Sequence, residues 1–359
     1  MKHCNDIVFV LPRFSGGGAE KVAINLLTGL HNRGYEISIV VFDKSGELLP
    51  MISDNIPIYN LFTFTLKRSI VPLIKKIRQL NPKIVFSTFG YVNVALLATY
   101  WFLPRQTEVW IREANLPSIS LPNNSKPKLM HYLYRFLSPK ADKLICTSMR
   151  MKNEFISNFS VSESMIEVLS NPVDVELIRK SSLPVRYFDN GGVRYVASGR
   201  LIFQKGFDRL LHWFSELDNK KSTLVILGDG NSRIDLIQLS NQLNLQDRVE
   251  FVGFCDNPWQ WYAGADVFLL PSRWEGMPNV ALESLACGTP VIATKESGGI
   301  KEIVENDDII IVNSEKQFVD AMNKVDMKDK SFIFNSLLPN RFRKENVVSI
   351  VEGWLNEIK

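Results

Sequence analysis

Hydrophobic residues along the chain gather in short runs that alternate with longer stretches of helical periodicity. The runs are apolar at successive positions and are bounded by polar, Gly or Pro residues. This pattern is typical of strands buried on both faces of a parallel sheet. The predicted strands are residues 7–11, 37–42, 84–87, 143–147, 195–197, 224–227, 249–252, 267–270, 291–293 and 309–312.

Apolar residues between these runs recur at the spacing of an amphipathic helix. Two predicted faces are Val22, Ile24, Leu26, Leu27 and Leu30, and Leu210, Leu211, Phe214 and Leu217. A third is Val347, Ile350, Val351, Trp354, Leu355 and Ile358, in the last stretch of the chain. Alternating strands and helices predict an α/β fold whose parallel sheets carry helices on both sides.

The alternation stops over residues 181–193, where Pro184 and the Asn190-Gly191-Gly192 turn break regular structure. We place the domain boundary there, with one domain over residues 1–182 and another over 183–340. A final helix over residues 341–359 can pack back on the first domain. The length of 359 residues suits two domains of roughly 100–200 residues each.

Composition narrows the class of protein. With 45% hydrophobic and 22% charged residues the chain is ordinary globular protein, which excludes a disordered, collagenous or coiled-coil chain. The four cysteines are far apart in the sequence, so a zinc site or a disulfide framework is disfavoured. Every apolar run is shorter than the roughly 18 residues of a membrane span. We therefore expect a cytoplasmic protein whose membrane contact, if any, is peripheral.

Charge is distributed unevenly about the net value of +4. Residues 1–180 hold 22 Lys and Arg against 14 Asp and Glu, whereas residues 181–359 hold 20 against 24. A basic first half is compatible with a phospholipid surface, a nucleic acid or a phosphorylated acceptor, and equally with an uneven surface that has no partner.

Candidate chemistry lies in the second half. Gly199 to Gly206 follow a predicted strand and precede a helix, and Arg200 and Lys205 add two cations to that loop. Ligands of open parallel sheets bind beyond the carboxyl ends of the strands. A fork-shaped guanidinium and a compact ammonium there would suit a diphosphate, although a solvated loop with chance charges is the alternative.

Two glutamates flank a predicted helix start. Glu275 lies in the loop after a strand, Asn279 is the predicted N-cap, and Glu283 lies in the first turns of a helix that ends at Gly288. The backbone N–H groups near Asn279 and Val280 would form an anion site. Alternatively, Glu283 is a surface helix residue and Glu275 only ends a strand.

The first half offers a glycine loop and a polar segment. Gly16-Gly17-Gly18 follow the first strand and open a helix, but Lys21 replaces the last glycine of the dinucleotide fingerprint, which disfavours NAD. Residues 110–115, Trp-Ile-Arg-Glu-Ala-Asn, follow another predicted strand. They offer Arg112, Glu113 and Asn115 to a ligand, with a loop salt bridge between Arg112 and Glu113 as the alternative.

Taken together, these motifs resemble the retaining GT-B glycosyltransferases of glycosyltransferase family 4. Seven residues separate Glu275 from Glu283, as in the paired-glutamate signature of that family. The glycine loop, the Arg200–Lys205 segment and the Gly228-Asp229-Gly230 turn match in order and spacing, as does Ser297-Gly298-Gly299 followed by Glu302. The matches extend from residue 16 to about residue 303.

The resemblance implies two Rossmann-like domains facing across a cleft, the first for the acceptor and the second for a nucleotide-sugar. Arg200 and Lys205 would bind the donor diphosphate, Glu275 the donor sugar and Glu283 the ribose. The implied donor-binding residues are Gly16, Gly17, Gly18, Gly199, Gly228, Gly253, Phe254, Gly276, Met277, Pro278, Asn279, Val280 and Glu283. Arg112, Glu113 and Asn115 would contact the acceptor, or the donor. Relatives carry a histidine near those positions and this chain has none.

The implied reaction is retaining transfer of a hexose or N-acetylhexosamine from a UDP-sugar to a glycan, without a metal or other cofactor. No Asp-x-Asp motif and no cluster of metal ligands occurs in the sequence. A sugar-nucleotide epimerase of the same architecture, or a catalytically silent partner of another transferase, is the alternative. Nucleic-acid binding is disfavoured because no recognition motif accompanies the basic half.

Two basic stretches in the first half favour contact with an anionic membrane and a lipid-linked acceptor, as in O-antigen, capsule or lipopolysaccharide synthesis. One combines Lys67, Arg68, Lys75, Lys76 and Arg78 with Ile70, Val71, Leu73, Ile74 and Ile77. The other comprises Lys126, Lys128, His131, Tyr132, Tyr134, Arg135 and Phe136. Ordinary amphipathic helices packed on a sheet are the alternative. The inner face of the cell membrane is the expected location.

Overall fold

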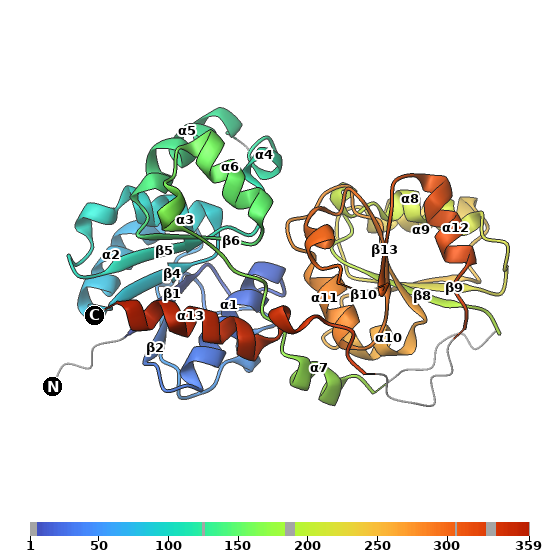
Figure 1. The fold of residues 1–359 in the computed structure, drawn as a ribbon, viewed down its shortest axis with the longest axis horizontal. Helices are drawn as coiled ribbons and strands as arrows, with labels where there is room; N and C mark the ends of the chain where they lie inside the picture. The colour runs from blue at the N-terminus through green and yellow to red at the C-terminus, as the bar shows by residue number, and fades with distance from the viewer. Residues whose placement is uncertain (1–5, 124–125, 184–190, 306, 328–334, 359) are drawn as a thin grey trace. The chain divides into compact units, whose positions relative to one another are not determined.

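The computed structural model describes residues 6–123, 126–183, 191–305, 307–327 and 335–358. Its internal contacts divide the chain into two compact units, each built on one sheet (Figure 1). The first unit comprises Met1–Pro172 with Lys344–Lys359, and the second comprises Val173–Arg343. The chain therefore passes from one unit to the other twice.

The first unit contains a seven-stranded, all-parallel sheet in the order β3-β2-β1-β4-β5-β6-β7. The strands are β1 (Ile7–Leu11), β2 (Ile37–Val41), β3 (Ile58–Asn60), β4 (Ile84–Ser87), β5 (Glu108–Arg112), β6 (Lys143–Cys146) and β7 (Ile166–Val168). The register pairs Ile7 of β1 with Ile37 of β2 and Ile84 of β4. A strand order that reverses beside β1 is the doubly wound arrangement of a Rossmann-like fold.

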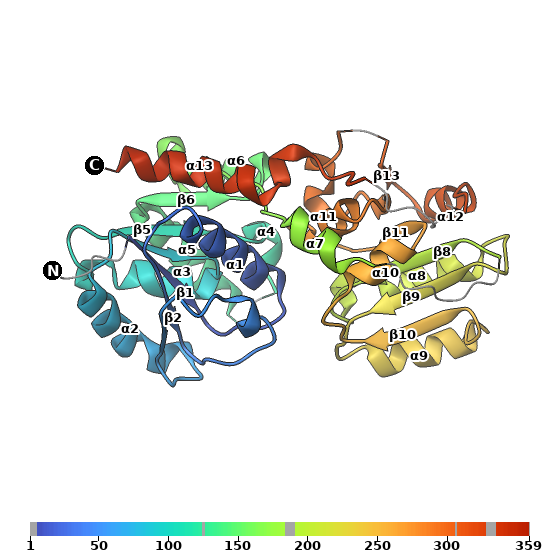
Figure 2. The ribbon, with the colours of Figure 1, turned by 90° about the horizontal axis from the view of Figure 1, so that it is seen from below.

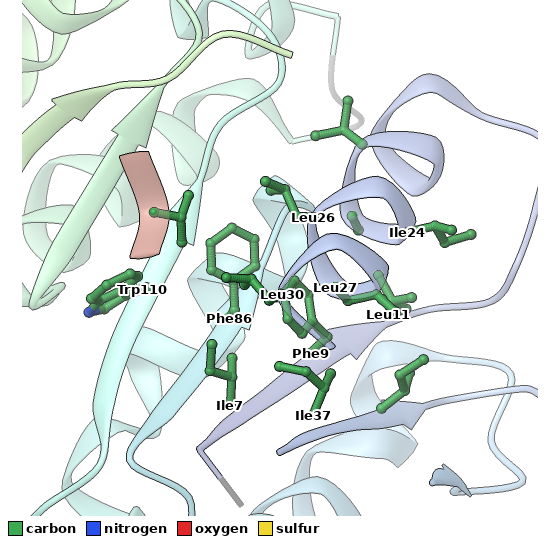
Figure 3. Close-up of a cluster of buried hydrophobic side chains, with 14 of the residues drawn as sticks. Ile7, Phe9, Leu11, Ile24, Leu26, Leu27, Leu30, Ile37, Phe86 and Trp110 are labelled. Atoms are coloured by element: carbon green, nitrogen blue, oxygen red, sulfur yellow. The ribbon is translucent and has the colours of Figure 1, made fainter. Parts of the chain in front are cut away.

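Helices cover both faces of this sheet. Their bounds are α1 (Gly18–His31), α2 (Leu66–Leu80), α3 (Gly90–Ala98), α4 (Pro117–Ser120), α5 (Pro127–Leu137), α6 (Met149–Phe159) and α13 (Lys344–Glu357). Short 3-10 turns lie at Leu49–Met51, Tyr100–Phe102, Ser138–Lys140 and Glu163–Met165. On one face Leu27 and Leu30 of α1 lie over Phe9 and Phe86 of the strands (Figure 3). On the opposite face α2, α3, α5 and α6 enclose a second apolar core.

The last helix, α13, packs against α1 within the first unit. Val347, Val348, Val351 and Trp354 are buried in the same cluster as the apolar face of α1. The two helices approach closely at Gly29, where an added Cβ would lie 2.5 Å from Cγ2 of Val348. Ile350, which the periodicity placed on the buried face, is instead 44% exposed. Val348 is buried in its place, against Gly29 of α1.

The second unit contains a six-stranded, all-parallel sheet in the order β10-β9-β8-β11-β12-β13, and Figure 2 shows β10, β9 and β8 in that sequence. Its strands are β8 (Arg194–Ser198), β9 (Thr223–Leu227), β10 (Val249–Gly253), β11 (Val267–Leu270), β12 (Val291–Thr294) and β13 (Ile309–Val312). The reversal of strand order beside β8 again defines a Rossmann-like domain.

Helices α8 (Phe207–Ser215), α9 (Arg233–Gln242) and α12 (Glu315–Asn323) cover one face of the second sheet. Helices α7 (Val175–Ser181), α10 (Trp259–Gly264) and α11 (Asn279–Ala286) cover the other. The 3-10 turns are Phe203–Lys205, Gly298–Glu302 and Asn340–Phe342. Helices therefore cover both faces of the second sheet. The polar loops at its strand ends are the part of the sheet left accessible to ligands.

The boundary expected between residues 182 and 183 differs from the division found by contacts. Helix α7 lies before that boundary but packs against α10 and α11 of the second unit, so the units divide at Pro172. Residues 184–190 of the expected linker lie outside the described residues. Apolar contacts of α7 with the second core, through Val175 and Ile178, explain the difference.

The ten predicted strands are confirmed, and no predicted strand end is more than one residue from the observed one. Three strands lacked a prediction of their own: β3 and β7, which are three residues long and only partly buried, and β5, which carries charged residues at both ends. Across the described ranges, no helix combines the length and apolar character needed to cross a membrane.

Candidate active site

Three loops meet at the carboxyl edge of the second sheet. The N–H of Gly199, after β8, donates to the carbonyl of Leu227 at 3.0 Å. The N–H of Gly228, after β9, donates to the carbonyl of Gly253 at 2.7 Å. These bonds bring three of the predicted donor-binding glycines to adjacent strand ends, where parallel sheets bind their ligands.

An ion pair joins two loops at the same edge. Nζ of Lys205 lies 2.5 Å from Oε1 of Glu275, and the hydroxyl of Ser272 donates to the same oxygen at 2.7 Å. The side chains of Lys205 and Glu275 are only 15% and 8% exposed. Lys205 ends a 3-10 turn after β8, whereas Glu275 follows β11, so the fold alone brings the two residues together. Ser272 has no distinguishing sequence signal apart from its place three residues before Glu275.

Glycines let the backbone close tightly around Glu275. Gly298, after β12, has φ +58°, and a Cβ there would lie 2.0 Å from the carbonyl oxygen of Glu275. The N–H of Gly299 donates to the carbonyl of Gly276 at 2.7 Å. The predicted Ser297-Gly298-Gly299 motif therefore packs against the backbone of Glu275 and Gly276. Any side chain at Gly298 would displace that backbone.

Two arginines brace the loop before Glu275, and neither was singled out from the sequence. Nε and Nη2 of Arg209 donate to the carbonyls of Pro271 and Ser272, each at 2.8 Å. Arg273 forms a bidentate pair with Asp208, at 2.8 and 2.7 Å. Burial and these bonds act in opposite directions on Asp208, and the bonds to Arg273 keep the pKa of its carboxyl below the usual value. The sequence distinguishes these two arginines from other surface arginines only by their positions, Arg209 on α8 and Arg273 in the loop after β11.

Glu283 lies on α11, as predicted, and is buried rather than on the surface. Its Oε2 accepts a hydrogen bond from Nε1 of Trp259 at 3.0 Å. The predicted N-cap is wrong by one residue, because Pro278 is the cap and Asn279 is the first helical residue. Pro278 is extended, as an N-cap residue is, and Asn279 begins the helix. Met277 is buried and Val280 is half-buried in this segment.

Arg200 differs from its neighbour Lys205. Its side chain is exposed, and among the described residues it takes part in none of the ion pairs. Phe254, which follows β10, is 54% exposed at the same edge. The second unit thus presents a solvent-exposed guanidinium, a buried Lys–Glu pair and an exposed aromatic ring from neighbouring strand ends.

In the first unit, Gly17 is the N-cap of α1 and Gly18 its first residue, which confirms that the glycine loop opens a helix. The N–H of Gly16 donates to Oε2 of Glu47 at 3.1 Å. The loop after β2 is joined to this segment, since the N–H of Leu48 donates to the carbonyl of Phe14 at 2.9 Å. A carboxylate therefore already occupies one backbone donor of the glycine loop.

The segment over residues 110–115 was expected to follow a strand, but Trp110 to Arg112 belong to β5 itself. Arg112 and Glu113 are buried, at 1% and 5% exposure, and of the three expected ligand contacts only Asn115 is exposed. Nη2 of Arg112 donates to Oδ1 of Asn171, while Nε and Nη1 lie buried without a hydrogen-bond partner. The two charged side chains thus bind separate partners instead of forming a loop salt bridge.

Glu113 is hydrogen-bonded by two neutral side chains. Nδ2 of Asn93 donates to Oε1 of Glu113 at 2.7 Å, and the hydroxyl of Tyr134 donates to Oε2 at 3.2 Å. Burial raises the pKa of Glu113 to about 7, against the opposing effect of these two hydrogen bonds and of Arg112. Burial likewise lowers the pKa of Arg112 to about 10. Tyr134, expected in a surface patch, is buried because its hydroxyl faces Glu113.

Metal ligands are not grouped in the described part of the chain, where no set of three or more His, Cys, Asp or Glu side chains could hold an ion.

Comparison with known proteins agrees with this architecture. Residues 16–177 match the family described as Glycosyltransferase Family 4, and residues 186–338 match Glycosyl transferases group 1. The N-acetylgalactosamine-N,N'-diacetylbacillosaminyl-diphospho-undecaprenol 4-alpha-N-acetylgalactosaminyltransferase of Campylobacter jejuni is 29% identical over 88% of this chain and 88% of its own length. The lipopolysaccharide core biosynthesis glycosyltransferase LpsE of Rhizobium meliloti is 25% identical over 79% of this chain and 77% of its own.

Among solved structures, Alr3699/HepE of Anabaena in complex with UDP superposes with a TM-score of 0.78 at 19% identity, over 98% of this chain and all of that one. Two Rossmann-like domains with this likeness and these motifs define a GT-B glycosyltransferase. The two matched segments together span nearly the whole chain, and the protein belongs to glycosyltransferase family 4.

Proposed function

We propose that this enzyme transfers a hexose or an N-acetylhexosamine from a UDP-sugar to a lipid-linked glycan, with retention at the anomeric carbon. The observation that carries the proposal is the buried Lys205–Glu275 pair, with Ser272, at the carboxyl edge of the second sheet. A buried ion pair held by glycine loops is preorganised, because its groups need not rearrange as charge develops on a substrate.

The donor assignment follows from the chemistry of this edge. Arg200 is exposed and can form two parallel hydrogen bonds to a phosphate, while Lys205 supplies a compact charge beside it. Glu275 would accept hydrogen bonds from hydroxyls of the donor sugar, and Glu283 from those of the ribose. The exposed ring of Phe254, beside Gly253, suits a planar base. The Anabaena structure that resembles this chain was solved with UDP, which favours a uridine nucleotide.

In the proposed reaction the bond between the anomeric carbon and the diphosphate oxygen breaks, and the acceptor oxygen bonds to the same face of that carbon. The acceptor proton passes to the departing phosphate oxygen. Negative charge grows on the diphosphate, where Arg200 and Lys205 would oppose it. These two cations would perform the role that a divalent metal performs in other transferases, so we propose that transfer needs no metal.

The acceptor assignment rests on the relatives and on the first unit. The Campylobacter relative is named for a diphospho-undecaprenol acceptor, and LpsE for lipopolysaccharide core biosynthesis. Asn115 follows β5 in the first unit. Of the three residues expected to contact the acceptor, it is the exposed one. Arg112 and Glu113 lie buried behind it and would act on a ligand only through the backbone that they support.

Helix α5 supports peripheral membrane contact at the inner face of the cell membrane. Leu129, Tyr132 and Phe136 are 49%, 58% and 53% exposed, whereas Tyr134 and Leu137 are buried. Their spacing gives one apolar outer face, and the exposed Lys126, Lys128 and Arg135 flank it. Helix α2 supports contact less strongly, because Leu73 and Ile77 are buried in the core and only Val71 of its apolar residues is largely exposed.

Vesicle co-sedimentation tests this surface. We expect the protein to bind vesicles that contain anionic lipid and to bind neutral vesicles less. Phe136→Ser combined with Leu129→Ser should reduce that binding severalfold, whereas Ile234→Ser, which changes a residue of the second unit that is 70% exposed, should not. Equal binding by the α5 variant and the wild type would exclude α5 as the contact.

Activity itself is tested with the purified full chain and a panel of UDP-hexoses and UDP-N-acetylhexosamines. Undecaprenyl-diphosphate-linked mono- and disaccharides in detergent serve as acceptors, in the presence and absence of a chelator. We expect a lengthened lipid-linked glycan by mass spectrometry, an anomeric configuration equal to that of the donor by NMR, and no loss of rate with the chelator. An inverted product would contradict retention, and dependence on added metal would contradict the metal-independent reaction.

The two alternative functions give different results in the same assay. An epimerase would change the UDP-sugar without any acceptor, whereas a silent partner would bind UDP and turn nothing over. The transferase proposal requires that the donor sugar appears on the acceptor.

A further inference from the structure

Two loops beside the Lys205–Glu275 pair are fastened to each other. The N–H of Arg273 donates to the carbonyl of Gln204 at 2.8 Å, and Nε2 of Gln204 donates to the carbonyl of Trp274 at 2.9 Å. Nη1 of Arg273 donates to the carbonyl of Phe203 at 2.7 Å. Together with the ion pair, these bonds make the loops after β8 and β11 one rigid surface.

This surface carries aromatic rings that the proposed donor site does not use. Phe203 is 64% exposed, and its ring centroid lies 6.2 Å from that of the half-buried Trp274, with the ring planes inclined at 55°. The guanidinium of Arg273 lies 3.9 Å from the centre of the Phe203 ring, and its bidentate pair with Asp208 fixes it there. We call Phe203, Arg273 and Trp274 the aromatic shelf.

An exposed phenylalanine held in place by a fixed arginine is not accounted for by folding. Large apolar side chains at the surface lose the stabilisation that burial would provide. A cation over one ring contributes of the order of 0.5–1 kcal/mol at an exposed site and restricts the motion of that ring. The shelf is therefore preorganised, and a preorganised exposed ring loses little conformational entropy when a ligand packs on it.

The position of the shelf identifies the reactant that would use it. Phe203 is two residues from Lys205 and Trp274 is adjacent to Glu275, so the shelf and the ion pair come from the same two hydrogen-bonded loops. The exposed Arg200 provides charge for a diphosphate, whereas Arg273 is paired with Asp208 and its guanidinium lies against the Phe203 ring. A surface of flat rings without net charge suits the C–H face of a pyranose better than a phosphate.

We propose that the aromatic shelf is a stacking subsite for a pyranose ring of the glycan acceptor. This inference rests on the proposed transferase function and assigns part of acceptor recognition to the second unit. The apolar face of the sugar would pack on Phe203 and Trp274. N–H groups of Arg273 that are not taken up by Asp208 and Phe203 would donate to its hydroxyls.

The test uses Phe203→Ala, a change at an exposed position that removes the ring and leaves the backbone bonds in place. With saturating donor, the acceptor KM for an undecaprenyl-diphosphate-linked saccharide should rise about tenfold. The donor KM and the thermal shift caused by UDP should stay within about twofold of wild type. Phe203→Tyr should restore the acceptor KM, because it restores a stacking ring.

Two further variants are matched to this change. Trp101→Ala removes an exposed ring from the first unit, where Trp101 is 79% exposed, and should leave the acceptor KM unchanged. Phe254→Ala removes the ring at the proposed base pocket and should raise the donor KM instead. The direct probe is saturation-transfer NMR with methyl glycosides of the hexoses and N-acetylhexosamines, where the wild type should show ring-proton contact that Phe203→Ala loses.

An unchanged acceptor KM in Phe203→Ala would overturn the inference and leave the transferase function intact. A higher donor KM with an unchanged acceptor KM would overturn it in favour of stacking on the nucleobase. If the wild type transferred no sugar to any acceptor in the panel, the proposed function would fail first, and the shelf assignment would fall with it.

Discussion

Two buried glutamates show how differently the two units treat charge. Glu275, in the second unit, is paired with Lys205 and bonded to Ser272. Glu113, in the first unit, accepts hydrogen bonds from the neutral side chains of Asn93 and Tyr134, and burial raises the pKa of its carboxyl to about 7 against the opposing effect of Arg112. Both follow strands in parallel sheets of similar topology.

The comparison teaches that a buried carboxyl alone does not indicate a catalytic role. A carboxylate that is charged and paired can act at once on a substrate, because its counter-ion also bears on the developing charge. A carboxyl whose pKa is raised by burial binds a proton more readily and couples to the stability of its domain. We therefore expect changes at Glu275 to appear in the reaction rate and changes at Glu113 to appear in the pH dependence of folding.

The largest effect is expected at Glu275. Glu275→Ala should reduce transfer by about a thousandfold, because it removes the group proposed to hold the donor sugar and leaves Lys205 unpaired. UDP binding, measured by thermal shift, should remain largely intact. Glu315→Gln, which changes an exposed glutamate on α12, should have no effect on either quantity. Near-normal transfer by Glu275→Ala would remove Glu275 from the active site.

A side chain at Gly298, where an added Cβ would meet the Glu275 carbonyl, should lower the stability of the second unit strongly. Gly298→Ala should lower the free energy of unfolding of the second unit by at least about 2 kcal/mol, because φ is positive and the new Cβ would meet the Glu275 carbonyl. Gly191→Ala is the matched control, since its φ is +70° but no atom of the described residues lies within 4 Å of the new Cβ. It should cost only about 1 kcal/mol. Equal losses in denaturant unfolding would mean that the backbone contact is unimportant.

The pH dependence of stability tests the environment of Glu113. Because its folded-state pKa is raised, its stabilising contribution is complete below the unfolded pKa of about 4.3 and is lost as the pH rises through about 7. Glu113→Gln keeps an acceptor for Asn93 and removes the charge. The variant should gain stability relative to wild type between pH 4 and pH 8, by of the order of 3 kcal/mol. Parallel unfolding curves for the two proteins across that range would contradict the raised pKa.

The smallest effect is expected at Arg200, whose side chain is exposed. Arg200→Ala should weaken UDP binding about tenfold and slow transfer, through loss of hydrogen bonds to the diphosphate. The melting temperature without ligand should not change, because no buried contact is lost. Lys221→Ala changes another exposed cation of the second unit and provides the comparison by calorimetry. If both variants bound UDP equally well, Arg200 would have no part in the donor site.

The sequence by itself determined the alternation of strands and helices, because parallel strands buried on both faces must be apolar at successive positions. It therefore predicted β1, β4 and β11 to the residue. It missed β3 and β7, which are short and partly exposed, and it took Arg112 for a loop residue because a charge seldom ends a buried strand. Glu275, Glu283, Arg200 and Lys205 were visible as motifs, since their spacing is local.

Only the tertiary structure decided which of those residues meet. Lys205 and Glu275 are 70 positions apart, and no local pattern reports that β8 and β11 are neighbours in the sheet. The arginines that brace the site, Arg209 and Arg273, are ordinary surface residues in the sequence and gain their role from carbonyls and carboxylates supplied by other elements. Burial also arises only in the folded chain. Within one short motif, Glu113 is buried and has a raised pKa, whereas Asn115 is exposed and accessible to a ligand.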